Sequence, residues 1–461
     1  MKATAKLLVT ATAILFHFVS SAQVTFERLY NPGTSLSIDL TFDGGYIIGK
    51  TISYDTAGYY KIDSIGNILW MKSYPNARMG SIIQCDDTGY IFCASDNNFG
   101  DTYPIFVKTN AAGDTLWRKN FYVFGENGYG IEVIKSFDNG YIFISSDHIE
   151  MGETHFLIRG TNDTANVLWE TLITSTLGSV WVDALQKTLD SNYVAVNSRS
   201  NYNPELNIAK ISRNGILLWD TTYSQASYNQ GTIQVNSVCA AFDGGFLVLG
   251  QHEDNIADSN FMFMLKTNAN GDSLWSKEYV YGNYGMFFSG IEMQDSGFLL
   301  LGNAADTGAL VLMKTDANGD SLWTKKYFGL GRAFGSSIKK AHDCGFIVVG
   351  STTDTVANLT YDYVLKLDCN GDVITNIQLP TVNQSTMISV YPNPAKDNFT
   401  ISVNQEMQNG LVEVFNSLGN KIYSKHFSGS TTTISNKLNS GFYFVRVSDV
   451  EEVVVRKLIV E

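Results

Sequence analysis

A unit that recurs seven times between Asp43 and Asp372 constrains the fold of this chain more than any other feature. The first half of the unit reads Asp-x-Gly-aromatic followed by an apolar run, as in Asp43–Gly49, and the second half reads apolar-Lys-x-x-x-x-Gly-x-x-Leu-Trp, as in Lys61–Trp70. The aromatic position advances by 44, 51, 52, 53, 52 and 48 residues. One such unit cannot bury its own apolar face, so the copies must stack on each other.

Each unit is typical of four short antiparallel strands. Asp-x-Gly supplies a tight turn between the first two strands, and Asn-Gly-Asp or Ala-Gly-Asp supplies a second tight turn before the Trp strand. The other two connections are longer. Four strands per unit, repeated seven times, predict an all-β chain with a seven-bladed β-propeller over residues 23–380.

The N-terminal segment Val24–Tyr30 resembles the Trp strand of the first repeat, Ile68–Tyr74. We expect this segment to join the last blade and close the ring, because closure removes exposed sheet edges.

Six of the seven tryptophans occupy one position of the repeat, and Trp181 is the exception. Ringed tryptophans could stack on sugars, or they could wedge between neighbouring sheets. Their fixed register, one per blade, favours the packing role.

Residues 1–22 have the pattern of a secretory signal peptide. Lys2 and Lys6 precede the apolar run Leu7–Phe18, and Ser20-Ser21-Ala22 would precede the cut. The run is too short to span a membrane, so the mature protein is expected to lack a transmembrane anchor. No Cys follows the expected cut, which argues against a lipoprotein.

The composition changes after a polar linker at residues 381–389. The C-terminal segment contains Tyr391-Pro392-Asn393-Pro394-Ala395, the alternating run Phe442–Val447 and the final Lys457–Val460. Strict alternation marks half-buried strands, and several such strands predict a small immunoglobulin-like β-sandwich over residues 390–461.

This segment, roughly residues 386–461, resembles the type A C-terminal sorting domain of the type IX secretion system of Bacteroidota. The resemblance implies export across the outer membrane to the cell surface or the medium, with the translocon of that system as partner. The positions that match the recognition landmarks of the family are Gly441, Phe442, Tyr443, Lys457, Leu458, Ile459 and Val460. The alternative is a plain accessory β-sandwich.

The net charge of the chain narrows the classes of possible binding partner. With a net charge of −13 and a pI near 4.9, the chain lacks the basic surface of a protein that binds nucleic acid or anionic membranes.

Cys344 and Cys369 replace other residues in the two tight turns of the seventh repeat, and they do so only there. We therefore predict a disulfide between them in an oxidising compartment.

The sequence contains no established catalytic motif. Asp147–His155 holds two His and three carboxylates, which could bind a metal or form a solvated loop, and the loop is favoured because no other repeat shares the spacing. Asp316–Asp320 resembles the start of a Ca²⁺ loop, but Gly319 is misplaced for one, which favours a hairpin turn. No metal and no cofactor is predicted.

The face opposite the tight turns is the expected location of a ligand site, because its longer loops vary between copies. The candidate binding residues there are Trp181, Tyr284, Phe288, Asp254 and Asp306. Aromatic rings with carboxylates suit a glycan or protein ligand, although such aromatics could instead pack the central channel. The leading hypothesis is a non-enzymatic binding or adhesion module. The alternatives are a carbohydrate-active enzyme, a hydrolase or lyase that uses carboxylates of this face, and a structural surface protein.

Overall fold

The computed structural model describes residues 24–53, 55–96, 102–121, 127–149, 153–174, 180–199, 205–224, 231–254, 259–280, 285–304, 307–355, 357–373, 388–396, 398–416, 421–435, 438–448 and 453–460. These residues form strands and turns without any helix, so none of them belongs to a helix that could cross a membrane. The chain divides into two compact units, Val24–Ile374 and a unit that includes Thr375–Glu461. The expected signal peptide, residues 1–22, lies outside the described residues.

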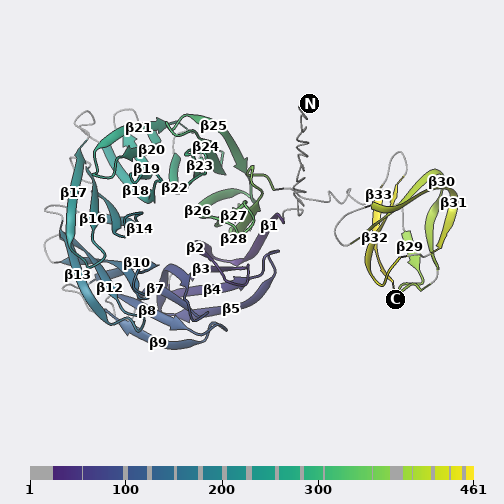
Figure 1. Cartoon of the computed structure of the whole chain (residues 1–461), viewed down its shortest axis with the longest axis horizontal. Helices are drawn as coiled ribbons and strands as arrows, with labels where there is room; N and C mark the ends of the chain where they lie inside the picture. Colours follow the sequence, from purple (N-terminus) through teal and green to yellow (C-terminus); the bar gives the residue numbers. More distant parts are fainter. Residues whose placement is uncertain are drawn as a thin grey trace, which may run out of the picture. The chain divides into compact units, whose positions relative to one another are not determined.

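The first unit consists of seven four-stranded antiparallel sheets around a ring, which confirms the predicted propeller (Figure 1). Blade 1 contains β2 (Thr34–Leu40), β3 (Tyr46–Ser53), β4 (Thr56–Ile62) and β5 (Ile68–Pro75). Blade 2 contains β6 (Ala77–Gln84), β7 (Tyr90–Asp96), β8 (Tyr103–Thr109) and β9 (Thr115–Asn120). Blade 3 contains β10 (Asn127–Lys135), β11 (Tyr141–Ile149), β12 (Glu153–Thr161) and β13 (Val167–Thr174).

The remaining blades follow the same order from the axis outward. Blade 4 contains β14 (Val180–Lys187), β15 (Tyr193–Arg199), β16 (Glu205–Ile211) and β17 (Leu217–Ser224). Blade 5 contains β18 (Gly231–Ala240), β19 (Phe246–Asp254), β20 (Ser259–Thr267) and β21 (Ser273–Tyr279). Blade 6 contains β22 (Gly285–Glu292), β23 (Phe298–Ala304), β24 (Ala309–Thr315) and β25 (Ser321–Tyr327). Blade 7 contains β26 (Arg332–Lys340), β27 (Phe346–Asp354), β28 (Leu359–Leu367) and β1 (Phe26–Pro32).

Strand β1 closes the ring, as expected from its resemblance to the Trp strands. It pairs antiparallel with β28 as the outermost strand of blade 7. Phe26 and Tyr30 are buried, and both contact Gly66 of blade 1: the Phe26 ring packs on it, and the Tyr30 hydroxyl donates a hydrogen bond of 2.7 Å to its carbonyl. Between the same two blades, a fully buried ion pair joins Lys50 Nζ to Asp362 Oδ2 at 2.8 Å. The first and last blades are therefore held together by both apolar and ionic contacts.

The repeated tryptophans pack each blade onto the next. Trp275 of blade 5 lies on Gly319 in the second tight turn of blade 6, where an added Cβ would come within 2.8 Å of the indole. Trp70 on Gly113, Trp169 on Gly215, Trp219 on Gly271 and Trp323 on Gly371 repeat the contact. Only glycine leaves room for this approach, and its positive φ of 80° at Gly319 suits the turn. The tryptophan and the glycine of the repeat thus form one packing unit.

The Trp275→Ala variant is expected to lose about 3–5 kcal/mol of unfolding free energy, because the substitution leaves a cavity between two blades. Urea denaturation of the secreted protein measures the loss. Leu274→Ala in the same strand is the matched control, since its side chain is 55% exposed; it is expected to change the free energy by no more than about 0.5 kcal/mol. Equal stability of the two variants would rule out the packing role.

The repeated Lys and Asp form a second architectural unit. In six blades the lysine of the third strand makes an ion pair with the Asp of the first tight turn: Lys61–Asp43, Lys108–Asp87, Lys210–Asp190, Lys266–Asp243, Lys314–Asp295 and Lys366–Asp343. The hydrogen bond from Lys314 lowers the pKa of Asp295. The sequence predicts the Asp as a turn residue but does not reveal its lysine partner. These repeated lysine and aspartate charges are therefore paired with each other within each blade.

Blade 3 departs from this pattern. Arg159 replaces the lysine and pairs with Glu170 at 2.6 Å, while Asp138 pairs with Arg213 of blade 4. Ala165 replaces the turn glycine and has a positive φ of 54°.

The two predicted turn cysteines meet in blade 7. The Cα atoms of Cys344 and Cys369 are 5.4 Å apart and their sulfurs are bonded in the structure, whereas the free cysteines among the described residues, Cys85, Cys93 and Cys239, are buried. The state of this pair in the secreted protein stays a prediction.

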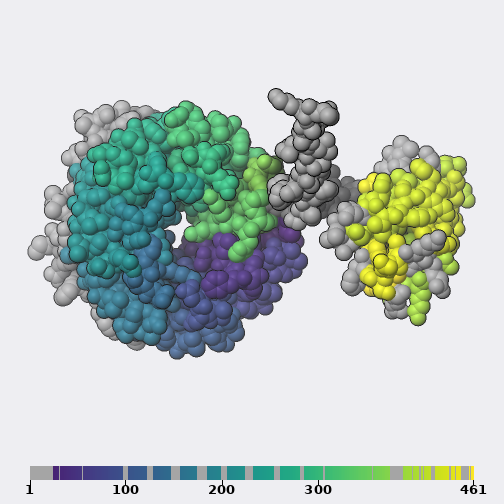
Figure 2. Space-filling model, viewed as in Figure 1, coloured from purple at the N-terminus to yellow at the C-terminus, as the bar shows by residue number. Residues whose placement is uncertain are grey.

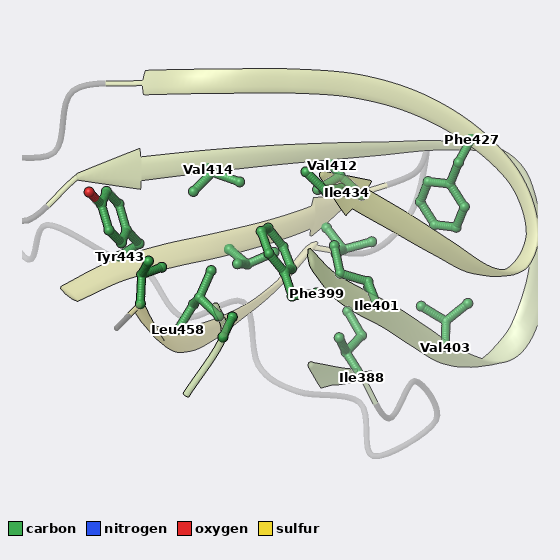
Figure 3. Packing of buried hydrophobic residues seen from close by; sticks show 14 of the residues in the cluster. Ile388, Phe399, Ile401, Val403, Val412, Val414, Phe427, Ile434, Tyr443 and Leu458 are labelled. Carbon is green, nitrogen blue, oxygen red and sulfur yellow. The ribbon is translucent and has the colours of Figure 1, made fainter. Parts of the chain in front are cut away.

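The C-terminal unit is a small all-β domain. It contains β29 (Ile388–Tyr391), β30 (Asn398–Asn416), β31 (Lys421–Ser435), β32 (Gly441–Ser448) and β33 (Val453–Val460). The strand order is β29-β30-β32-β33, with β31 also paired to β30. The first part of β30 pairs with β29 and the second part with β32, so the sheet bends on itself around the side chains seen in Figure 3. This nearly closed sheet matches the expected small β-sandwich, although β29 begins at Ile388, inside the predicted linker.

Candidate binding groove

The residues predicted on the loop face are only partly described. Phe288 lies in β22 and lines the central channel instead of a loop. Trp181 lies in β14 and Asp254 at the end of β19, but their side chains lie outside the described residues, as do Tyr284 and Asp306 entirely. Of these five residues only Phe288 has a described side chain, so the role of the set stays a prediction.

The suggested metal segments have turn and strand geometry. Asp147 pairs with His155 across the β11–β12 hairpin, so the expected loop between these strands is shorter than the segment Asp147–His155. In Asp316–Asp320, the Asp316 carboxylate accepts the N–H groups of Asn318 and Asp320, as in a hairpin turn. Within the described part of the chain, no group of three His, Cys, Asp or Glu side chains could hold a metal ion.

A central channel runs between the innermost strands of the blades. Each of these seven strands carries a register shift near its middle, as at Gly130/Glu132 and Phe287/Ser289. The extra residues enclose a cavity of about 200 Å³ with lining residues from all seven strands, at the opening seen in Figure 2. Such bulges redirect side chains toward the axis.

The channel widens on the face that carries the tight turns, here called the turn face. A cavity of about 460 Å³, the channel mouth, is lined there by Asp39, Leu40, Phe42, Ile83, Gln84, Glu132, Ile134, Lys135, Leu185, Gln186, Lys187 and Lys339. The lysines come from three strands, β10, β14 and β26, which only the ring brings together. The Phe42 ring is 62% exposed, with Lys135 Nζ 5.0 Å from its centroid.

Two carboxyl groups face the channel mouth. Burial raises the pKa of Glu132 to about 7, opposed in part by the Leu185 N–H and by Lys339. Burial likewise raises the pKa of Asp39, against the charge of Lys339. Each carboxyl accepts a main-chain N–H from the next blade, Leu185 at 2.7 Å and Gln84 at 3.0 Å. The Ser81 hydroxyl accepts the N–H of Val133 in the same way, at 2.8 Å. The carboxyls therefore serve as interblade hydrogen-bond acceptors.

The lysines of the channel mouth have fewer anionic partners than the repeated lysines of the blades. Lys187 Nζ donates to the Ser136 carbonyl at 3.0 Å and lies 4.6 Å from the Phe137 ring centroid. Burial and the nearby charge of Lys135 lower the pKa of Lys187. Lys135 pairs with Asp86 at 2.5 Å. Among the described residues, neither Lys187 nor Lys339 makes an ion pair.

A second cavity of about 670 Å³ opens between blades 2 and 3, and is here called the blade 2–3 groove. Its lining residues are Cys85, Asp86, Asp87, Lys108, Leu116, Trp117, Lys135, Ser136, Asn139, Gly140, Tyr141, Asp163, Thr164 and Lys187. It shares Lys135 and Lys187 with the channel mouth. At this junction Ala165 stands where the corresponding turns have glycine. The departure of blade 3 from the repeat thus coincides with this cavity of about 670 Å³.

The groove lies on the face opposite the one expected to hold the ligand site. The signal that could have indicated the turn face is the presence of Lys135 and Lys187 where other repeats have Leu40, Gln84 or Ala240.

Two segments that match the recognition landmarks of the sorting family, Gly441–Tyr443 and Lys457–Val460, are neighbours in the C-terminal domain. Gly441 pairs with Val460, Phe442 with Ile459 and Tyr443 with Leu458 across β32 and β33. The Tyr391–Ala395 segment joins them: the Ala395 N–H donates to the Ile459 carbonyl, and the Ile459 N–H donates to the Asn393 side chain, both at 2.8 Å. All three sequence landmarks thus meet on the final strand.

Several solved structures are similar to this chain at low sequence identity. A protein of unknown function from Bacteroides caccae is 14% identical and covers 66% of this chain and 97% of its own, with a TM-score of 0.40. An α-L-arabinofuranosidase from Fusarium graminearum is 8% identical, with coverages of 63% and 92% and a TM-score of 0.44. The propeller domain of a trilobed protease from Pyrococcus furiosus is 10% identical, with coverages of 72% and 95% and a TM-score of 0.43. Nothing about function follows from likenesses at this level.

An endo-acting ulvan lyase from Formosa agariphila is 38% identical over 64 residues, which are 13% of this chain and 12% of that enzyme. The chain thus spans about an eighth of the length of this curated relative.

Residues 389–461 match the family described as the secretion system C-terminal sorting domain. The domain directs secretion to the cell surface or outside. The chain is therefore a seven-bladed β-propeller that carries a type IX secretion C-terminal sorting domain.

Proposed function

We propose that this chain is an exported propeller that binds a glycan or protein ligand and does not catalyse a reaction. The observation that carries the proposal is the pair of neighbouring cavities on the turn face, the channel mouth and the blade 2–3 groove, which share Lys135 and Lys187. Aromatic, amide, hydroxyl and charged side chains converge there on a rigid ring, as in binding sites. The predicted loop-face set of Trp181, Tyr284, Phe288, Asp254 and Asp306 remains a second candidate surface.

The translocon of the type IX system is the proposed partner of the sorting domain during export. The β32–β33 pair, in which Gly441 pairs with Val460 and Tyr443 with Leu458, is the proposed recognition element.

A carbohydrate-active enzyme is the second candidate function, and the raised pKa of Glu132 favours it. A carboxyl with a pKa of about 7 could act as a general acid near neutral pH. Hydrolysis also needs a second carboxylate at a suitable separation, and Asp39 faces the same cavity. Against this function, both carboxyls already accept interblade hydrogen bonds, a role that Ser81 fills without a charge.

A glycan array combined with a protein pull-down, both with the mature chain from residue 23, tests the proposal. Binding to a glycan or a protein is expected, without shortening of any bound polysaccharide. Depolymerisation of a bound glycan would favour the enzyme, and absence of any ligand in both assays would refute the binding function.

The Glu132→Gln variant separates the two functions further. Because the folded pKa of about 7 exceeds the ordinary value of 4.5, the stabilising contribution of Glu132 is full below about pH 4.5 and declines as the pH rises to about 7. Glutamine does not ionise, and its side-chain oxygen can still accept the Leu185 N–H. The variant should therefore gain stability relative to the natural protein as the pH rises through this window, measured by urea unfolding at several pH values.

Ligand affinity should survive the Glu132→Gln change if the carboxyl is an interblade acceptor. A polysaccharide-cleaving activity that is present in the natural protein and lost in Glu132→Gln would instead identify Glu132 as a general acid and contradict the binding proposal.

A further inference from the structure

We propose that the channel mouth and the blade 2–3 groove together bind an acidic sugar chain, with the acidic group held by Lys187 and Lys339. The inference rests on the proposed binding function and names its ligand class and site. It concerns the turn face, opposite the surface expected from the sequence.

The first argument is the placement of cations. The chain has a net charge of −13, yet lysines from β10, β14 and β26 converge on one cavity of about 460 Å³. Two of them, Lys187 and Lys339, have no ion-pair partner among the described residues. Bringing lysines together without matching anions is unfavourable, because their charges repel. Repulsion by Lys135 is one cause of the lowered pKa of Lys187. A bound anion would relieve this repulsion.

The second argument is that these lysines are not part of the repeated architecture. Lys61, Lys108 and their equivalents are needed in every blade for the turn ion pair. Lys135 and Lys187 occupy positions where blades 1, 2 and 5 have Leu40, Gln84 and Ala240. Packing of the ring therefore does not require a lysine at those positions.

The carboxyl groups that line the same two cavities do not exclude a site for an anion. Asp87 is paired with Lys108, and Asp86 with Lys135. Asp39 and Glu132 each accept a main-chain N–H. Burial raises the pKa of Glu132 to about 7, which reduces its negative charge near neutral pH, and burial also raises the pKa of Asp39. Asp163 also lines the groove, on the turn that carries Ala165.

The third argument concerns the sugar. The groove continues from the lysines to Trp117, which is half-buried, and to Asn139 and Thr164. An aromatic face, an amide and a hydroxyl can accept a sugar ring by stacking and hydrogen bonds. A peptide that binds by strand addition needs a free sheet edge, whereas this hollow is built from turn tips and the ends of inner strands. The combination favours an acidic polysaccharide.

The test compares the mature protein with Lys187→Gln/Lys339→Gln in binding to polygalacturonate, dextran sulfate, neutral dextran and poly-L-glutamate. Affinity for at least one acidic polysaccharide is expected to fall about tenfold in the double variant. Lys187→Arg should retain binding, because it keeps the charge. Lys277→Gln is the matched control: it removes a lysine of 29% exposure on the outer strand of blade 5, and its affinity should stay within about twofold.

The outcomes separate the site from the function. Unchanged affinity in the double variant, in a protein that does bind a glycan, would refute this site and leave the binding function intact. Equal binding of poly-L-glutamate and acidic polysaccharide would refute the sugar class. Binding of polygalacturonate without dextran sulfate would assign the acidic group as a carboxylate, and the reverse as a sulfate, either of which supports the proposal. Absence of binding to any ligand in the array would refute both the proposed site and the binding function.

Discussion

Replacing both Phe26 and Tyr30 by alanine is expected to lower the free energy of unfolding by at least about 5 kcal/mol. A buried Phe→Ala change alone costs about 3–5 kcal/mol. Phe26 and Tyr30 are both buried, and the Phe26 ring packs on Gly66. The double variant also loses the hydrogen bond from Tyr30 to the Gly66 carbonyl. Because these contacts join the last blade to the first, their loss opens the ring and weakens every blade junction near it.

Urea denaturation of the secreted protein measures this effect. Leu29→Ala is the matched control in the same strand, because Leu29 is 40% exposed, and it should change the unfolding free energy by about 1 kcal/mol or less. A double variant as stable as Leu29→Ala would show that β1 does not close the ring.

The second large effect concerns export. Removal of residues 453–461 is expected to reduce the extracellular amount of the protein to background in a bacterium with a type IX secretion system. The deletion removes β33, and with it the buried Leu458 and Val460 and the partner of the Gly441–Tyr443 segment. Without this strand the sheet of the sorting domain cannot close.

Immunoblots of periplasm and medium measure this prediction, and the propeller should accumulate in the periplasm. His426→Ala, an exposed substitution in β31 of the same domain, should be exported like the natural protein. Normal export of the truncated chain would contradict the role assigned to the final strand.

The repeat made most of the fold predictable. Asp-x-Gly, the second turn and the Trp position fixed the strands, their number per blade and their order, because each depends on residues close in sequence. Closure by β1 was also predictable, since Phe26 and Tyr30 have the spacing of Trp70 and Tyr74. The sorting domain was predictable from Tyr391–Ala395 and the alternation of Phe442–Val447.

The candidate site was not predictable because it depends on contacts between blades. Lys135, Lys187 and Lys339 lie in three repeats, and only the ring brings them to one axis. The register shift in each inner strand decides which residues face that axis, and it placed Phe288 in the channel wall. The Lys–Asp ion pairs were missed for a similar reason, since strand pairing and not sequence distance brings Lys61 to Asp43.

The central claim is that the shared residues of the repeat hold the ring, while the departures from it on the turn face bind the ligand. Measuring unfolding free energy and affinity for an acidic polysaccharide side by side in Trp275→Ala and Lys187→Gln tests it most directly. The account predicts that Trp275→Ala loses about 3–5 kcal/mol of stability and keeps its affinity under native conditions, and that Lys187→Gln keeps its stability and loses affinity. Loss of stability without loss of affinity in Lys187→Gln would contradict it.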